Sequence, residues 1–118
     1  MGALSIERFK LMAQEMRGVL RDQGYIVKIK HLRRYPNPGG FNRASRFIYE
    51  TRHQANVRGL GVPDAFGGAT EVIVLDGKSI KLAVQAHCRS NEAYVPSLGA
   101  VIALGRAVKA LTTKARVR

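Results

Sequence analysis

Hydrophobic residues near the start of the chain recur at alternating spacings of three and four residues. The series is Ile6, Phe9, Ala13, Met16 and Leu20. Ser5 stands before it as a favourable N-cap, and Gly24 follows it as a natural C-terminal stop. This spacing predicts an amphipathic helix over residues 5–23, with its charged side chains facing solvent.

The hydrophobic period shortens to two residues after this helix. Tyr25, Val27 and Ile29 lie in one phase of the alternation, and Ile26, Lys28 and Lys30 lie in the other. This pattern predicts a strand over residues 25–31, with both lysines on its solvent-facing side. Two prolines and two glycines then fall within residues 33–40, where we expect a basic loop.

Residues 41–58 fit two structures. Phe47 and Tyr49 favour a strand over residues 46–51, while residues 43–54 also fit a short helix, and intrinsic propensity does not separate the two. We favour the strand. Glycine and proline recur through residues 59–68, which predicts a turn-rich loop between strands.

A β-hairpin is predicted in the second half of the chain. Residues 70–76 are rich in β-branched side chains, and residues 79–87 alternate between apolar and polar positions. Between them, Asp76 and Gly77 form a favoured two-residue turn sequence.

The chain ends with a second helical pattern. Residues 91–96 predict a loop, and Ser97 can cap a helix over residues 97–111. Its apolar face consists of Leu98, Val101, Leu104, Val108 and Leu111. Gly99 and Gly105 would allow this helix to approach another element closely. We expect it to pack on the sheet.

The order of these elements predicts the α+β class. We expect a single small domain over residues 1–113, with a mainly antiparallel sheet of three or four strands covered by an N-terminal and a C-terminal helix. Residues 114–118 would form a basic C-terminal tail. A chain of 118 residues is long enough to bury a core without disulfides.

The positive charge of the chain indicates which class of molecule it binds. The chain has 20 Lys and Arg against 8 Asp and Glu, a formal net charge of +12, and no acid lies between Asp22 and Glu50. A strongly basic domain of this kind attracts polyanions, which favours nucleic acid as the partner. The sequence does not distinguish DNA from RNA or single from double strands, and it leaves the oligomeric state unknown.

Aromatic residues interleave with the basic run, as a groove for bases and phosphates requires. Tyr35 is the expected exposed ring. Alternatively, Tyr25, Phe47 and Phe41 belong to the core, and the arginines reflect a GC-rich coding sequence on an ordinary basic surface. The candidate nucleic-acid contacts are Lys28, Lys30, Arg33, Arg34, Tyr35, Arg43, Arg46, Arg116 and Arg118.

Other chemistry is weakly supported. His87 and Cys88 are neighbours in a strand, so they point to opposite faces, and a typical zinc site of about four ligands would have to use the one cysteine together with His31, His53 and His87. We expect no enzymatic activity, no cofactor and no metal. The lone cysteine favours the reducing cytoplasm, and residues 94–111 are too short and too charged to span a membrane.

Residues 87–91 (HCRSN) end a predicted strand, and residues 102–107 (IALGRA) lie on the following helix. This arrangement resembles the C-terminal part of small uncharacterised phage-encoded proteins. It departs from them at residues 94–97, which carry no cation where those proteins usually carry basic residues. The resemblance implies a phage origin, which would place the protein in the host cytoplasm.

These observations favour a non-enzymatic module that binds nucleic acid or a nucleoprotein through phosphate contacts from the basic strand and loop. The main alternative is a small phage-encoded inhibitor or adaptor that binds a host protein complex, such as a polymerase or nucleoprotein defence machinery. Such a protein would present exposed apolar anchors beside a charged rim. A third hypothesis is that the protein is a structural component of a virion or a ribonucleoprotein.

Overall fold

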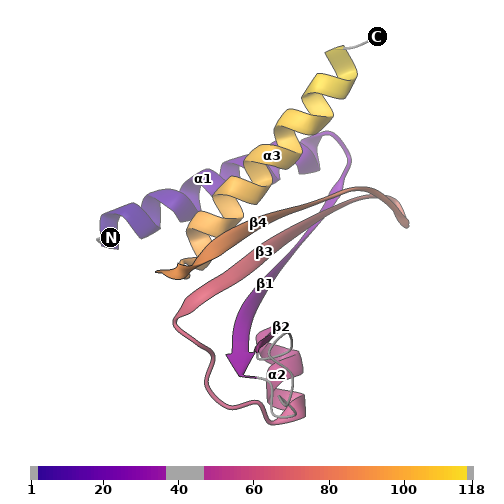
Figure 1. Ribbon diagram of the computed structural model, residues 1–118. Helices are drawn as coiled ribbons and strands as arrows, with labels where there is room; N and C mark the ends of the chain where they lie inside the picture. Colours follow the sequence, from indigo (N-terminus) through magenta and orange to yellow (C-terminus); the bar gives the residue numbers. More distant parts are fainter. Residues whose placement is uncertain (1–2, 37–46, 117–118) are drawn as a thin grey trace.

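The computed structural model describes residues 3–36 and 47–116. The elements are α1 (Ala3–Asp22), β1 (Ile26–Pro36), β2 (Phe47–Glu50), α2 (Arg52–Arg58), β3 (Phe66–Asp76), β4 (Ser79–Ala93) and α3 (Pro96–Arg116). The strands form one sheet in the order β2-β1-β3-β4, and every neighbouring pair is antiparallel. The predicted α+β class is confirmed, with α1 and α3 on the same side of the sheet (Figure 1).

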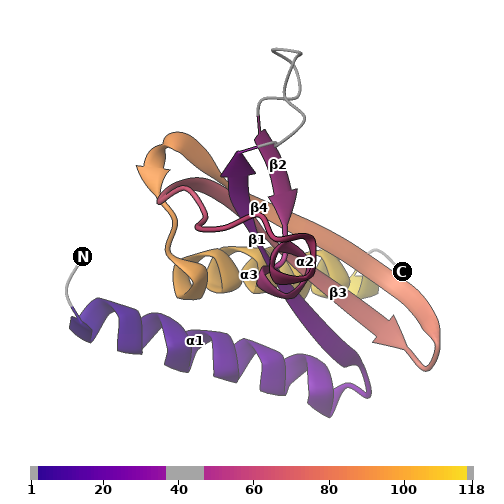
Figure 2. The ribbon, with the colours of Figure 1, turned by 90° about the horizontal axis from the view of Figure 1, so that it is seen from below.

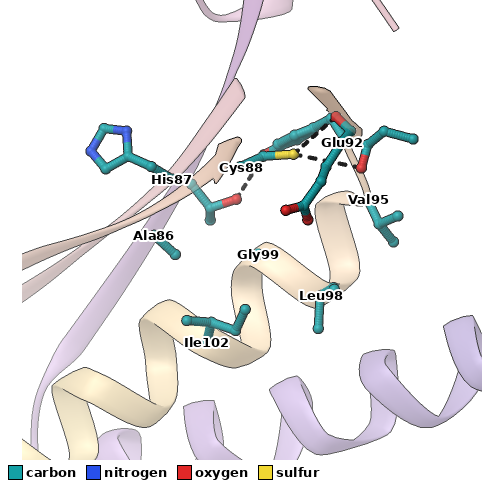
Figure 3. A pocket seen from close by; sticks show the side chains of 11 residues that line it. Ala86, His87, Cys88, Glu92, Val95, Leu98, Gly99 and Ile102 are labelled. Atoms are coloured by element: carbon teal, nitrogen blue, oxygen red, sulfur yellow. Dashed lines mark hydrogen bonds between the residues drawn. The ribbon is translucent and has the colours of Figure 1, made fainter. Parts of the chain in front are cut away.

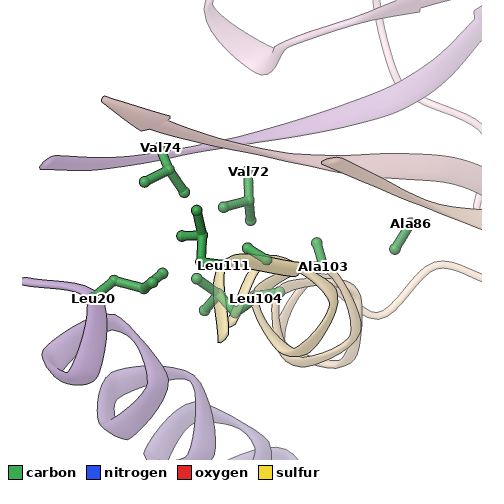
Figure 4. Packing of buried hydrophobic residues seen from close by; sticks show 9 residues of the cluster. Leu20, Val72, Val74, Ala86, Ala103, Leu104 and Leu111 are labelled. Atoms are coloured by element: carbon green, nitrogen blue, oxygen red, sulfur yellow. The ribbon is translucent and has the colours of Figure 1, made fainter. Parts of the chain in front are cut away.

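The core lies between the sheet and these two helices. Val72 and Val74 of β3 point towards α3 and are fully buried, and Leu104 of α3 is fully buried against them (Figure 4). Leu20 joins this cluster from the last turns of α1. Small residues, Ala100, Ala103 and Ala107, form the buried stripe of α3 and allow it to lie close to the strands.

Two glycines are required by the contact between α3 and the sheet. A Cβ atom on Gly99 would lie 2.2 Å from Thr70 Oγ1, so only glycine fits where the first turns of α3 cross β3. Gly68 has a φ of +138° inside β3, and a Cβ there would lie 2.6 Å from the Tyr94 ring. The close approach expected of Gly99 is therefore confirmed, and Gly68 lies within a strand where a loop was predicted.

The strands extend further than their sequence pattern predicts. The basic loop expected from residue 33 is wrong for its first part, because β1 continues to Pro36 and pairs with β2 from Arg33↔Glu50 to Pro36↔Phe47. Pro36 is tolerated because it is the last residue of the strand. Similarly, β4 runs to Ala93, into the predicted loop over residues 91–96, because Ala93 pairs with Phe66.

The segment over residues 41–58 contains both of the structures considered for it. The predicted strand is present as β2, and a separate helix, α2, follows directly. Thr51 Oγ1 accepts a hydrogen bond from the Gln54 N–H and caps α2, while Gly59 ends the helix with a φ of 67°. This polar cap and glycine stop were available in the sequence.

The hairpin and the last helix agree with expectation in type and differ in detail. Asp76 pairs with Ser79, so the turn consists of Gly77 and Lys78, one residue later than predicted. Helix α3 reaches Arg116, so the predicted tail of residues 114–118 begins within it. Among the described residues, no helix is long and apolar enough to cross a membrane.

Candidate nucleic-acid interface

Helices α1 and α3 cover one face of the sheet, and α2 lies at the β2 end of the sheet, away from them (Figures 1 and 2). We call the face opposite α1 and α3 the open face, because neither of these two helices covers it. Residues of β1 that alternate with the core positions point to this open face. Lys28 pairs with Ile73, and Lys30 pairs with Glu71. In the same register, Ile73 pairs with Ala83 and Glu71 with Gln85, so the face continues across to β4.

Two exposed aromatic rings extend the open face onto β2. Tyr49 pairs with Arg34 and Phe47 pairs with Pro36, and these β1 residues lie in the same phase as the two lysines. Tyr49 is 50% exposed and Phe47 is 38% exposed. The open face therefore combines cations on β1 with rings on β2, along about 20 Å of strand at ~3.3 Å per residue.

The two lysines of the open face are not neutralised by the acid opposite them. Glu71 accepts a hydrogen bond from Gln85 Nε2 at 2.9 Å and forms no ion pair among the described residues. Lys28 and Lys30 are both exposed. Their ammonium groups can therefore approach a phosphate without first leaving a protein carboxylate.

Arg34, predicted as a phosphate contact, is already engaged within the protein. Its Nη2 lies 2.6 Å from Asp64 Oδ2, and only 12% of its side chain is exposed. Its guanidinium carbon lies 4.4 Å from the centroid of the Phe47 ring. Arg34 therefore anchors the loop before β3 to the open-face aromatic residue.

Asp64 holds that loop to the end of β1 through several bonds. Its N–H donates to the Arg34 carbonyl at 2.7 Å, and its own carbonyl accepts from Arg33 Nη2 at 3.3 Å. The Phe66 N–H and the Arg34 side chain hold the pKa of Asp64 below its ordinary value. The carboxylate is thus kept ionised as the partner of Arg34.

Tyr35 is not an exposed ring. It is 2% exposed and lies on the other side of β1 from Lys28, Lys30 and Arg34. The prediction that Tyr35 is an exposed ring is wrong, because β1 continues as a strand and its alternation turns Tyr35 inwards. The exposed rings among the described residues include Phe47 and Tyr49 on β2 and Phe66 on β3, so the alternative that places Phe47 in the core is wrong.

Arg33 shares the inner side of β1 with Tyr35 and lines a second feature of this region. A cavity of about 400 Å³ lies between the end of β1, α2 and the loop over residues 61–63. Its polar side chains come from Arg33, Tyr35, Arg52 and Asn56. We call it the β1–α2 pocket.

A buried polar cluster formed by Tyr94, Thr70 and His31 also positions the Arg33 side chain. Tyr94 donates a hydrogen bond to the Ala69 carbonyl, and its hydroxyl lies 2.7 Å from Thr70 Oγ1 and 3.0 Å from His31 Nδ1. The guanidinium carbon of Arg33 lies 5.2 Å from the Tyr94 ring centroid. Burial lowers the pKa of His31 and raises that of Tyr94, so both are neutral near pH 7.

Only some of the remaining residues predicted to contact nucleic acid lie within the described residues. Arg43, Arg46 and Arg118, with Phe41, lie outside the described residues, and Arg116 is the last residue of α3. Arg106 of α3 donates to the Gln85 carbonyl at 2.7 Å and so holds α3 to β4. The structure brings together Lys28 and Lys30 on one side of β1, and Arg33 and Tyr35 on the other.

Cys88 occupies a smaller cavity of about 90 Å³ between β4 and α3. Its Sγ lies within hydrogen-bonding range of the carbonyls of Arg89, Glu92 and Ala93, while His87 points away to the opposite side of the strand (Figure 3). The described residues contain no group of three or more potential metal ligands. The single S–H of Cys88 can donate to one of these carbonyls at a time, of which the Glu92 carbonyl is the nearest at 3.2 Å.

Comparison with protein-family models, curated proteins and solved structures finds no match for this chain.

Sequence reasoning missed the role of Asp64 and the exposure of Tyr49. The alternation through residues 47–50 could have placed Phe47 and Tyr49 on one face, had the pairing with β1 been known. No local pattern indicates that Asp64 meets Arg34, since the two lie 30 positions apart.

Proposed function

We propose that the protein binds single-stranded nucleic acid across the open face of its sheet. The observation that carries this proposal is the placement of two unneutralised lysines, Lys28 and Lys30, on the same face of the sheet as two exposed rings, Phe47 and Tyr49. Sheets with exposed aromatic residues bind single strands by stacking bases on the rings while cations contact the phosphates. The net charge of +12 supplies the long-range attraction.

In this arrangement each group has a distinct role. The lysines contact phosphates, which gives affinity without sequence preference. Tyr49 and Phe47 stack on successive bases, each stack contributing about 1 to 3 kcal/mol. Arg34 supports Phe47 from within the protein, and its ion pair with Asp64 keeps it from contributing a free positive charge.

Fluorescence anisotropy with labelled single- and double-stranded oligonucleotides over a salt series tests this function. We expect single strands to bind more tightly than duplexes. The double variant Lys28→Gln/Lys30→Gln should lower the slope of log affinity against log salt by about 1.4, at ~0.7 per phosphate contact on single strands. Tyr49→Ala should weaken binding and leave this slope unchanged.

The matched control is Arg8→Gln/Lys10→Gln, which removes the same charge from the exposed side of α1. It should retain the wild-type slope. If both double variants lower the slope equally, the binding is a general effect of net charge, and the open face is not the interface. Arg33 and Arg34 are unsuitable for this test because replacing them would disturb the loop at Asp64.

A second function is favoured by apolar side chains on the same surface. Ile80 is 65% exposed and Ile26 is 51% exposed at the hairpin end of the sheet, where Ile26 pairs with Leu75 and Leu75 with Ile80. Such anchors beside lysines suit an inhibitor or adaptor that docks on a host protein complex. Capture of one folded partner that survives nuclease treatment, and is lost in Ile80→Lys, would support this function over the first.

A further inference from the structure

The β1–α2 pocket differs from the open face in both shape and charge. It is concave, with a volume of about 400 Å³, and it lies on the inner side of β1, on the other side of the sheet from Lys28 and Lys30. Pockets of this size belong to the range that holds small molecules. A site of this kind is not needed for an extended strand on the open face.

Two arginines, Arg33 and Arg52, line the pocket, and no carboxylate neutralises either of them among the described residues. The acids at this end of the molecule are already paired, Asp64 with Arg34 and Glu50 with Arg58. Among the described residues, neither Arg33 nor Arg52 forms an ion pair. The segment over residues 37–46, which joins β1 to β2, contains no acid in the sequence.

Arg33 is held in place before any ligand arrives. Its Nη2 donates to the Asp64 carbonyl, and its guanidinium lies against the Tyr94 ring. Its Nε is buried without a hydrogen-bond partner among the described residues. Burial of an unpaired donor on a charged group is costly, and a bound ion or water can satisfy such a group; Arg17 Nε and Arg34 Nε are buried without a partner in the same way.

The pocket's composition selects the class of anion. A phosphomonoester carries a charge of about −1.5 to −2 at pH 7, which two arginines match, whereas a phosphodiester within a strand carries only one charge. Guanidinium groups also bind phosphate oxygens in pairs. The volume exceeds that of a phosphate alone, and the exposed Asn56 supplies an amide for the group attached to it.

We propose that the β1–α2 pocket binds a phosphomonoester of nucleotide size, with Arg33 and Arg52 holding the phosphate. The ligand is either a free nucleoside monophosphate or the phosphorylated end of a nucleic-acid strand. This site is independent of the open face, so either can exist without the other.

Calorimetric titration tests the proposal with adenosine 5′-monophosphate, adenosine and inorganic phosphate as probes. The monophosphate should bind, and adenosine should not. Arg52→Gln should weaken the monophosphate by about tenfold or more, the loss expected for a charge-assisted contact. Because Arg52 is exposed, the thermal unfolding midpoint of the Arg52→Gln variant should match that of the wild-type protein.

Arg58→Gln is the matched control, because Arg58 lies on the same helix, is exposed and faces Glu50 instead of the pocket. It should bind the monophosphate as wild type does. Equal binding by Arg52→Gln and wild type would overturn the proposal, as would equal binding of adenosine and its monophosphate. The proposal would also be overturned if neither the monophosphate nor inorganic phosphate bound and if a 5′-phosphate did not strengthen the binding of a strand.

Paired oligonucleotides with a 5′-phosphate or a 5′-hydroxyl distinguish the two sources. A 5′-phosphate preference that Arg52→Gln removes identifies a strand end, and binding of the monophosphate without this preference identifies a free nucleotide. Removal of Lys28 and Lys30 should leave the preference intact. A wild-type protein that binds the monophosphate but no oligonucleotide would refute the open-face function alone.

Discussion

Strand β1 contributes to two regions that are stabilised in different ways. Its first half lies under α1 and α3, where Val27 and Ile29 join an apolar core with Val72 and Leu104. Its second half pairs with β2 beside α2, where Arg33 and Arg34 hold the loop at Asp64 through ionic and hydrogen-bonded contacts. One strand thus carries both the core of the domain and its candidate binding groups.

The overall dimensions reflect this division. The radius of gyration is 16.0 Å, compared with about 13 to 14 Å expected for a compact domain of this length. The end formed by β2 and α2 projects from the helix-covered sheet (Figure 1). A large apolar core fixes the fold at one end, while at the other the few buried residues, such as Tyr35 and Ala55, are joined by polar contacts and leave charged and aromatic groups accessible.

The largest effect should come from the apolar core. Leu104→Ala removes a fully buried side chain and should lower the free energy of unfolding by about 2 to 5 kcal/mol. Ile102→Ala, on the same helix and 40% exposed, should cost clearly less. Denaturant unfolding measures both, and equal losses would mean that α3 is not seated on the sheet in this register.

A smaller loss is expected where α3 crosses β3. Gly99→Ala should lower the free energy of unfolding by about 1 to 3 kcal/mol, because its methyl group would overlap Thr70. Gly105→Ala has no neighbour closer than 3.9 Å and should raise stability by about 0.5 to 1 kcal/mol through helix propensity. Two stabilising substitutions would contradict the close crossing at Gly99.

A local loss of stability is expected at the end of the molecule formed by β2, α2 and the loop at Asp64. Asp64→Asn removes the carboxylate that pairs with Arg34 while keeping an oxygen for the Phe66 N–H. Amide hydrogen exchange should accelerate in α2 and residues 60–66 and stay unchanged in α3. Uniform acceleration across the protein would show that the two regions unfold as a single unit.

The smallest effect is on the pH dependence of stability, to which His31 contributes near the core and Asp64 contributes beside β2 and α2. Burial lowers the pKa of His31 in the folded state, so its contribution to stability is fully present above an unfolded pKa of about 6.5 and is lost as the pH falls towards the folded pKa. The pKa of Asp64 is also lowered, so its contribution is lost only below its unfolded value of about 3.9.

Denaturant unfolding at several pH values between 7.5 and 4.5 would test this difference. His31→Asn should flatten the loss of stability in this range, whereas His87→Asn, exposed on the opposite side of the sheet, should keep the wild-type profile. An unchanged profile in His31→Asn would show that burial of the imidazole does not control stability here.

The sequence alone determined the elements that depend on local periodicity and on turn chemistry. The spacing from Ile6 to Leu20 predicted α1, the alternation around Lys28 predicted the first half of β1, and the hairpin and α3 were also predicted. The α+β class followed from their order. These features are local because helix and strand periods place side chains on one face whatever the partner.

Only the tertiary structure decided how far β1 extends and what its second half faces. Residues 33–36 read as a loop because proline and glycine follow them, yet pairing with β2 satisfies their backbone groups and makes them a strand. That pairing turns Tyr35 inwards and Arg34 towards Asp64. Exposure of Tyr49 and formation of the β1–α2 pocket follow from the same long-range contacts, which no local pattern encodes.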